Sequence, residues 1–480
     1  MKRLNIYQKF LLLFLLSVTL QSCVTFRQEY SVQQNPIDSV FASKFFNATQ
    51  AAVSVYDLTD NKSIYKHNEK FLMHPASNQK ILTTTAAYLF LGKDYKFKTE
   101  VLHTGEIKDS VCIGDLYFIG GFDPDFSLHD LDSLVRQIKS FGIKEVKGNL
   151  YGDVSAMDSL FWGNGWMWDD DPYSFLPYLT SLNINKDNVM VVTSPSEINK
   201  PAFVNLNPQT NFFEIKNSSV TTDTGRNKLI VTRDWINRKN TIFDEGSINK
   251  SSVPDTTMLN VFNPAIYFLN LSKESCQRNR IRIDGRIDTL TLQNNGELIF
   301  SAEHSIDSVI RTANKNSDNL NAEMLLRAIA NKYFGKHSSA KEGLKFVDSL
   351  ITLAGFNPKN YLLVDGSGLS HYNLVSADLI TGILKYVYYY HPEIYKSVFN
   401  SFPISGYDGT LRNRMKNMLM FKRVHGKTGT LSGISCLSGY IESKNNHLIA
   451  FSILIQNYLG SAKKAHDIQD KLCELIYQMN

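Results

Sequence analysis

Strand-forming sequence at both ends of the chain is the feature that most restricts how it can fold. Near the beginning, residues 51–67 alternate apolar and polar side chains around a turn at Asp60 and Asn61, which is typical of a β-hairpin. Far along the chain, residues 423–456 hold three more short strand patterns, and a helical pattern over 462–477 follows them. We therefore expect one antiparallel sheet assembled from both ends of the chain, with the middle of the sequence inserted between its strands.

The middle of the chain differs from both ends in its residue composition and pattern. Residues 99–302 contain short alternating segments, many Asn and Asp residues, and three of the four tryptophans. This pattern predicts inserted β-rich material, which we expect to form two subdomains. The flanking segments, residues 36–98 and 303–480, then form the main domain, and the expected fold class is α+β. The predicted helices of that domain cover residues 77–91, 321–334, 340–353 and 376–389.

Composition excludes several other classes of protein. The 480 residues are 43% hydrophobic and 20% charged, with a formal net charge of +5, which is ordinary for a folded globular protein. No basic run interleaved with aromatic residues is present, so we expect no nucleic-acid partner. No apolar run reaches the ~20 residues that a membrane-spanning helix needs. The even composition also excludes low-complexity and coiled-coil chains.

The beginning of the chain resembles an export signal. Three basic residues precede an apolar run over residues 10–20, which is too short to span a bilayer but matches a secretory signal peptide. The run leads to Cys23 in the sequence LQSC, which resembles a bacterial lipobox. We expect residues 1–22 to be removed, Cys23 to be acylated, and residues 23–35 to act as a polar tether from the membrane. The alternative is an ordinary signal peptide in which Cys23 has no special role.

The other cysteines and the histidines indicate no cofactor. Cys112, Cys276, Cys436 and Cys473 lie far apart without CxxC spacing, and we expect them to be buried free thiols. The eleven histidines are scattered, without an HExxH sequence or an i,i+4 pair, so we predict no metal site.

A candidate nucleophile lies at the start of the predicted helix over residues 77–91. Ser77 and Lys80 form an SxxK pair behind Pro75 and share one helix face, so the lysine amine can reach the serine hydroxyl. The positive end of the helix dipole favours the negative charge that develops on the oxygen. SxxK alone is a weak signal, because four other positions match it and because Ser77 could simply cap the helix.

Two further motifs strengthen this assignment. The sequence SDN at residues 317–319 comes directly before a predicted helix, and KTGT at residues 427–430 lies on a predicted strand. Taken alone, SDN could simply be a helix-capping turn, and KTG could simply be part of an exposed edge strand. In the order SxxK, SDN, KTG they are the three elements of penicillin-recognising serine enzymes. SDN follows SxxK by 240 residues, a gap that requires an inserted domain. This agrees with the change in composition and sequence pattern over residues 99–302.

With these motifs, the chain resembles the low-molecular-mass class C penicillin-binding proteins, the D-alanyl-D-alanine carboxypeptidase/endopeptidase family typified by penicillin-binding protein 4. The likeness covers nearly the whole mature chain. It is also carried by GGFDP at 120–124, GWMWDDDP at 165–172, DGSGLS at 365–370 and GYDGTL at 406–411. The resemblance implies a serine DD-peptidase/β-lactamase-like domain, an antiparallel sheet flanked by helices, with inserted β-rich domains.

Three catalytic roles are implied by the resemblance. Ser77 is the nucleophile that forms an acyl-enzyme, Lys80 is the general base, and Ser317 relays a proton between Lys80 and the leaving amine. A free lysine amine has a pKa near ~10.4 and would be almost fully charged at neutral pH. We therefore expect burial and the positive charge of Lys427 to lower the pKa of Lys80.

The resemblance also implies substrate-binding roles. Asn319 binds the substrate's amide, and Lys427 supplies a positive charge opposite the terminal carboxylate. The hydroxyls of Thr428 and Thr430 act as further donors. The backbone N–H groups of Ser77 and Thr430 form the oxyanion hole.

A pocket for the amino-terminated side chain of the stem peptide is implied for the inserted region. The resembled family places a carboxylate and an aromatic ring there, and Asp170 with Phe175 is the best match in this sequence. The alternative is that the acidic run at 169–171 forms a solvated turn, with the neighbouring tryptophans in a domain interface.

We therefore expect an exported, periplasm-facing and membrane-tethered serine D-Ala-D-Ala carboxypeptidase or DD-endopeptidase. Its substrates would be peptidoglycan stem peptides, β-lactams would be covalent inhibitors, and no metal or organic cofactor is expected. Two alternatives stay open: a catalytically silent peptidoglycan-binding lipoprotein that keeps the fold, and a β-lactamase or esterase of the same fold. The intact set of motif residues argues against the first, and the deacylation rate of a penicillin adduct distinguishes the second.

Overall fold

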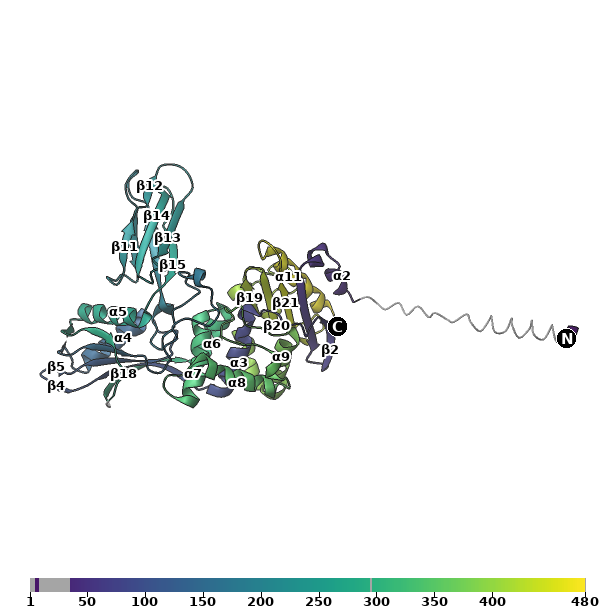
Figure 1. The fold of residues 1–480 in the computed structure, drawn as a ribbon, viewed down its shortest axis with the longest axis horizontal. Helices are drawn as coiled ribbons and strands as arrows, with labels where there is room; N and C mark the ends of the chain where they lie inside the picture. Colours follow the sequence, from purple (N-terminus) through teal and green to yellow (C-terminus); the bar gives the residue numbers. More distant parts are fainter. Residues whose placement is uncertain (1–4, 8–34, 294–295, 480) are drawn as a thin grey trace, which may run out of the picture. The chain divides into compact units, whose positions relative to one another are not determined.

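The computed structural model describes residues 5–7, 35–293 and 296–479 (Figure 1). Cys23 and nearly all of the predicted signal peptide and tether lie outside these residues. Within the described ranges, no helix combines the length and the apolar character needed to cross a membrane.

The chain divides into two compact units, residues 1–44 and residues 45–480. The first unit contains the short helix α2 (Asp38–Phe41). The 3-10 helix η1 (Lys44–Asn47) comes next in the sequence. The second unit contains all the other strands and helices named below.

One antiparallel sheet of five strands joins the two ends of the second unit. In order across the sheet, the strands are β19 (Val424–Leu431), β20 (Ile434–Glu442), β21 (Leu448–Gln456), β1 (Gln50–Asp57) and β2 (Lys62–His67). The first and last parts of the chain meet where β1 pairs with β21, with Gln50 opposite Gln456 and Asp57 opposite Ile449. The predicted sheet built from both ends of the chain is confirmed.

Helices lie on both faces of this sheet, and further helices pack on those. They are α3 (Gln79–Leu91), α6 (Ile306–Lys315), α7 (Asn319–Phe334), α8 (Ala340–Leu353), α9 (Ala377–Tyr390), α10 (Pro392–Ser401) and α11 (Lys463–Gln478), with the 3-10 helices η2 (Ala76–Asn78), η5 (Pro358–Asn360) and η6 (Gly409–Leu411). β20 and β21 are buried at nearly every position, which requires cover on both faces. α9 packs against β21 and β1, and α11 packs against β20.

α3 lies at the centre of the helical layer. Its side chains are buried from Gln79 to Tyr88, and it contacts α6, α7, α8, α9 and α10. The helix ends at Gly92, which has a φ of 89° that favours glycine. Because the first turn of α3 is already buried, Lys80 lies in the protein interior.

A mixed sheet joins the two ends of the inserted sequence. In order, its strands are β17 (Ile287–Thr289), β8 (Leu150–Asp153), β6 (Leu116–Gly121), β3 (Lys96–His103) and β18 (Glu297–Ser305). β3 and β18 pair antiparallel, with Lys98 opposite Glu303. The boundaries expected near residues 98 and 302 therefore fall within one strand pair. The division of the chain into domains stays a prediction.

Two helices that the sequence pattern did not indicate pack in this part of the chain. They are α4 (Leu128–Ser140) and α5 (Pro264–Arg278), and a small sheet accompanies them with strands β16 (Arg282–Ile283), β7 (Glu145–Val146), β5 (Val111–Ile113) and β4 (Glu106–Lys108). α4 begins with a capping box, in which Ser127 and Asp130 bond to each other's backbone N–H. The inserted region is therefore richer in helix than we expected.

A further group of strands lies between β8 and α5 in the sequence (Figure 1). One sheet has the order β10 (Phe203–Asn207), β9 (Asn188–Ser194), β15 (Asp255–Asn260). The other is built around β14 (Thr241–Asn249), which pairs with β11 (Glu214–Asn217), β12 (Val220–Thr222) and β13 (Lys228–Arg233). The 3-10 helices η3 (Trp168–Asp170) and η4 (Asn185–Asp187) precede these strands.

Two hydrophobic clusters form the core of the second unit. One cluster joins the helices and the five-stranded sheet, and it also takes in Met157 and Trp166 from the inserted sequence. Trp166 Nε1 donates to Asp365 Oδ2 at 3.0 Å, so part of the inserted sequence is anchored beside the SxxK helix and its neighbours. The second cluster lies around α4 and α5. The four cysteines expected to be buried free thiols are buried and free: Cys112, Cys276, Cys436 and Cys473.

Candidate active site

Ser77 lies in the turn that leads into α3. It belongs to η2, and the preceding Ala76 has a φ of 44°, which is unusual for a residue with a side chain. Ser77 is half-buried, whereas its neighbours in the turn are fully buried. η2 continues directly into α3, which places Lys80 one turn further along on the same side as Ser77.

Lys80 is fully buried and makes three hydrogen bonds. Its Nζ donates to Ser77 Oγ at 3.0 Å, to Asn319 Oδ1 at 2.6 Å and to the Ser367 carbonyl oxygen at 2.8 Å. Asn319 Nδ2 donates to the Phe175 carbonyl oxygen at 2.6 Å, which orients Oδ1 toward the lysine.

The three partners of Lys80 are not equivalent. The Asn319 and Ser367 oxygens can only accept hydrogen bonds, whereas the Ser77 hydroxyl can also donate one. A neutral amine has two N–H groups and one lone pair. It can therefore donate to the two carbonyl oxygens and accept the Ser77 proton, so all three positions suit a general base.

Burial lowers the pKa of Lys80 to about 8, and the nearby carboxylates of Asp365, Asp318 and Glu323 oppose this effect. A significant share of neutral amine is then present near neutral pH, as a general base requires. We expected Lys427 to contribute to this lowering. Burial and the charge of Lys80 also hold the pKa of Lys427 well below its usual value.

Ser317 and Lys427 form a second serine–lysine pair. Lys427 is fully buried, and its Nζ donates to Ser317 Oγ at 2.8 Å and to the Thr428 carbonyl oxygen at 2.8 Å. Ser317 has a φ of 60° in the turn before α7, and the Asp318 side chain caps that helix by accepting from Asn321 N. The SDN sequence therefore does start a helix, and in addition its serine contacts the lysine of the KTG sequence.

β19 approaches the nucleophile turn closely at Gly429. A Cβ at this position would lie 2.9 Å from the Ser77 backbone nitrogen, so only glycine fits here. Asn78 Nδ2 donates to the Lys427 carbonyl oxygen at 3.2 Å and ties the turn to the strand. The approach brings the Ser77 N–H beside the strand that carries Thr430, as a two-donor oxyanion hole needs.

A cavity of about 430 Å³ lies at these groups. It is lined by Ser77, Phe175, Asn316, Ser317, Asn319, Gly368, Leu369, Thr410, Arg414, Thr428, Gly429, Thr430, Leu431 and His466. Lys80 and Lys427 lie behind this lining and are fully buried. The Thr428 and Thr410 hydroxyls share a hydrogen bond of 2.6 Å. The structure thus brings together the SxxK, SDN and KTG residues that the sequence singled out.

Of the predicted pair Asp170 and Phe175, only Phe175 lines the cavity. Phe175 lines the cavity, stacks on Tyr173 with ring centroids 5.5 Å apart, and leaves 47% of its surface exposed. Asp170 is the last residue of η3 and does not line the cavity. Burial and the charge of Asp169 raise the pKa of Asp170. A substrate-binding role for Asp170 stays a prediction.

A loop to which the sequence assigned no role completes the contacts of Lys80. The Ser367 carbonyl accepts from Lys80, and Glu323 Oε1 holds this loop by accepting from Gly366 N and Ser367 N at 2.9 Å each. Glu323 is buried and forms an ion pair of 2.7 Å with Arg327. The DGSGLS sequence contributed to the family resemblance, but no sequence signal indicates that one of its main-chain carbonyls contacts the lysine.

A serine hydroxyl held against a buried lysine, next to an antiparallel sheet flanked by helices, defines a serine hydrolase of the penicillin-recognising class. Residues 33–479 match the D-Ala-D-Ala carboxypeptidase 3 (S13) family, and the chain belongs to this family. The predicted family, α+β fold class and enzyme class are confirmed.

Individual relatives agree with this assignment. The chain is 29% identical to the D-alanyl-D-alanine carboxypeptidase of Actinomadura over 453 residues, which cover 91% of this chain and 82% of that protein. It is similar to the crystal structure of penicillin binding protein 4 (dacB) from Haemophilus influenzae, with a TM-score of 0.82, 25% identity, and coverage of 92% of this chain and 100% of that one. The same Haemophilus protein complexed with a β-lactam gives a TM-score of 0.76 at 24% identity, with coverage of 92% and 99%. The chain is a serine-type D-Ala-D-Ala carboxypeptidase.

Proposed function

We propose that the enzyme removes the terminal D-alanine of peptidoglycan stem peptides, and cuts D-alanyl crosslinks, through an acyl-enzyme on Ser77. The contacts of Lys80 support this most directly, because two of its partners can only accept hydrogen bonds and the third is the Ser77 hydroxyl. Both activities follow from one site, since the two substrates present the same D-alanyl carbonyl to the nucleophile.

Acylation begins when Ser77 Oγ bonds to the carbonyl carbon of the penultimate D-alanine and Lys80 takes the hydroxyl proton. The carbonyl oxygen becomes an oxyanion that accepts from the backbone N–H groups of Ser77 and Thr430, each worth ~3–4 kcal/mol. The C–N bond then breaks, and the proton passes from Lys80 through Ser317 to the leaving amine. In deacylation, Lys80 takes a proton from the water that bonds to the acyl carbon. The C–Oγ ester bond then breaks, and Lys80 gives this proton to Ser77 Oγ, which restores both residues.

In this proposal, the terminal carboxylate of the substrate decides which lysine holds a proton. In the free enzyme three carboxylates favour the proton on Lys80, whereas burial and the charge of Lys80 disfavour it on Lys427. A substrate carboxylate bound beside Lys427 and Thr428 would raise the pKa of Lys427, and the resulting repulsion would help Lys80 to lose its proton. Asn319 would meanwhile bind the substrate's amide.

Release of D-alanine from a synthetic stem pentapeptide, and cleavage of a D-alanyl-crosslinked dimer, test this function. The wild-type enzyme should act on both substrates, and Ser77→Ala should act on neither. A pentapeptide with a terminal carboxamide should react at least about tenfold more slowly, because it cannot recruit the charge of Lys427. Turnover by Ser77→Ala would remove Ser77 from the role of nucleophile.

We also propose that β-lactams acylate Ser77 and that the adduct is hydrolysed slowly. The Haemophilus relative crystallised with a β-lactam supports this. The deacylation rate distinguishes the proposed peptidase from a β-lactamase of the same fold, since a β-lactamase would release its adduct rapidly.

For location, we propose export followed by lipid attachment at Cys23. The basic and apolar pattern of residues 1–22 and the LQSC sequence support this. The wild-type protein should then partition with membranes, and Cys23→Ser should be released or keep its signal peptide uncleaved. A wild-type protein found only in the soluble fraction would contradict the anchor and leave an ordinary signal peptide.

A further inference from the structure

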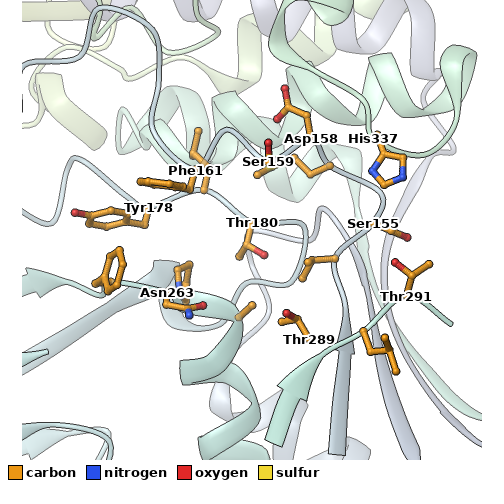
Figure 2. Close-up of a pocket in the computed structure, with 17 residues that line it drawn as sticks. Ser155, Asp158, Ser159, Phe161, Tyr178, Thr180, Asn263, Thr289, Thr291 and His337 are labelled. Carbon is orange, nitrogen blue, oxygen red and sulfur yellow. The ribbon is translucent and has the colours of Figure 1, made fainter. Parts of the chain in front are cut away.

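A second cavity, of about 460 Å³, shares no lining residue with the cavity at Ser77 (Figure 2). Its lining comes from residues 154–180, 262–265 and 289–291, together with His337. Its volume lies within the ~300–1,000 Å³ typical of small-molecule sites. We call it the aromatic–hydroxyl cavity, after the two kinds of side chain that line it.

Aromatic rings form one end of this cavity, as Figure 2 shows for Phe161 and Tyr178. These two rings stack with centroids 5.9 Å apart and planes 22° from parallel, and Phe262 meets Tyr178 edge-on at 5.2 Å. Phe161 leaves 40% of its surface exposed despite this packing. The Arg233 guanidinium lies 5.5 Å from the Tyr178 ring centroid and the Arg238 guanidinium lies 5.5 Å from that of Phe161. The part of the wall left for a ligand is therefore the exposed part of Phe161, which suits an apolar C–H group.

Hydroxyl groups surround the rest of the cavity. Figure 2 shows Thr180, Thr289 and Thr291 around the same central space. Thr180 and Ser155 are largely buried, with 6% and 7% of their surfaces exposed. The Thr180 hydroxyl accepts from Leu182 N at 3.3 Å, yet neither its proton nor that of Ser155 has an acceptor among the described residues. Buried hydroxyls normally have partners, so these two are available to a ligand.

The charges of the lining restrict what the ligand can be. None of the described residues that line the cavity is Lys or Arg. The buried Arg233 beside the Tyr178 ring is already paired with Asp171, so a phosphate or carboxylate would have the exposed Arg238, which lies over the Phe161 ring, as its nearby cation. The Asp158 carboxylate accepts from Leu160 N at 3.3 Å and points away from the central space in Figure 2. A pure hydrocarbon would leave the buried hydroxyls unpaired. A neutral ligand with both hydroxyl groups and an apolar face fits the lining.

We propose that the aromatic–hydroxyl cavity binds an N-acetylhexosamine unit of a glycan strand. The C–H face of the sugar ring would pack on the aromatic wall, and its hydroxyls would pair with Thr180 and Ser155. The acetamido group would pair with Asn263 and place its methyl group against Leu290. This inference rests on the proposed function, because the glycan strand is the part of peptidoglycan that carries the stem peptides.

The position of the cavity in the chain agrees with this occupant. Residues 154–180 supply most of the aromatic wall, and the same segment supplies Phe175 to the cavity at Ser77. Leu179 N donates to the Phe161 carbonyl oxygen at 2.9 Å, which holds the two ends of this segment together. One segment thus contributes to both cavities, so a glycan strand and its stem peptide could be bound by the same part of the chain.

Calorimetric binding of N,N′-diacetylchitobiose to the full-length Ser77→Ala protein tests the inference. We expect saturable binding that weakens at least tenfold when Phe161→Ala or Thr180→Val is added. Phe203→Ala is the matched control, because Phe203 is 62% exposed on β10 and lies outside both cavities. Thr180→Val keeps the shape of the side chain, and thermal melting confirms that each variant is folded. Maltose, which lacks acetamido groups, should not bind.

The outcomes separate this inference from the proposed function. Penicillin acylation of Phe161→Ala and Thr180→Val, with Ser77 intact, should match the wild type, because neither residue lines the cavity at Ser77. The inference is overturned if diacetylchitobiose fails to bind, if the two variants bind it as well as Phe203→Ala does, or if maltose binds equally tightly. Retained sugar binding without any penicillin acylation would support the inference and contradict the proposed function.

Discussion

The two cavities of this enzyme are similar in volume, about 430 and 460 Å³, and differ in how the buried cations beside them are paired. Behind the cavity at Ser77 are two fully buried lysines, each held by acceptors from distant parts of the chain. Beside the aromatic–hydroxyl cavity, whose described lining contains neither Lys nor Arg, the buried Arg233 is instead neutralised by an ion pair with Asp171. The difference shows what bond breaking requires beyond a shaped pocket, namely a group whose pKa is shifted by burial and a network that holds it against the nucleophile.

The largest effect should come from Lys80→Arg. Arginine keeps the positive charge but cannot give up its proton at these pH values, so the base is lost. We expect kcat/KM for the pentapeptide to fall by ~10³ or more, measured as D-alanine release. Binding of diacetylchitobiose should be unchanged, which would sharpen the contrast between the cavities. Substantial activity in Lys80→Arg would mean that another group is the base.

Gly429→Ala should reduce acylation next most strongly. The new Cβ would lie 2.9 Å from the Ser77 backbone nitrogen and would displace this proposed oxyanion-hole donor, so we expect a ~10²–10³-fold loss in acylation rate. Gly426→Ala on the same strand is the control, since its Cβ would come nearest to the end of the Leu437 side chain, at 3.1 Å. Equal rates for the two variants would contradict the close-approach argument.

Asn319→Asp should shift the pH dependence of the reaction. Activity requires neutral Lys80, whose pKa is about 8. For the wild type, kcat/KM should therefore be low at pH values below about 8 and should rise as the pH passes through about 8. A carboxylate in contact with Lys80 raises the pKa by ~1–3 units, which moves this rise to higher pH and lowers activity at pH 7 at least tenfold. Asn316→Asp is the control, because Asn316 lines the same cavity without a hydrogen bond to Lys80. An unshifted pH profile in Asn319→Asp would mean that the protonation of Lys80 does not cause the rise of kcat/KM with pH.

The smallest effect should come from Thr180→Val. Hydrolysis of a sugar-free pentapeptide should be unchanged, because Thr180 lies in the other cavity. On stem peptides still attached to glycan strands we expect a few-fold higher KM with little change in kcat, measured by product release from purified peptidoglycan. Equal KM values for wild type and variant on the attached substrate would break the proposed link between the cavities.

The five-stranded sheet could be predicted from sequence because its signals are local. A hairpin, three further strands and a terminal helix each show their own periodicity, so each element could be assigned from its own segment of sequence. The helices α4 and α5 were missed because the region around them alternates like strands. The capping box of Ser127 and Asp130, followed by buried Leu131 and Leu134, was a usable signal for α4.

The contacts of the candidate site also differ in whether the sequence could predict them. The contact of Ser77 with Lys80 follows from helix geometry and needs no tertiary information. The contact of Lys80 with the Ser367 carbonyl depends on a loop backbone, and the contact of Lys427 with Ser317 joins segments 110 residues apart. Such contacts leave no periodic trace in a single sequence. Asp170 does not line the cavity at Ser77, and its predicted role in substrate binding stays a prediction.

Mass spectrometry of the intact protein after incubation with penicillin tests the central claim, that Ser77 is the nucleophile and Lys80 its base. We predict a mass increase of one penicillin molecule that persists for minutes and that peptide mapping assigns to Ser77. Ser77→Ala should show no increase, and Lys80→Arg should acquire the adduct far more slowly. An adduct mapped to another serine, or one formed by Ser77→Ala, would contradict the account.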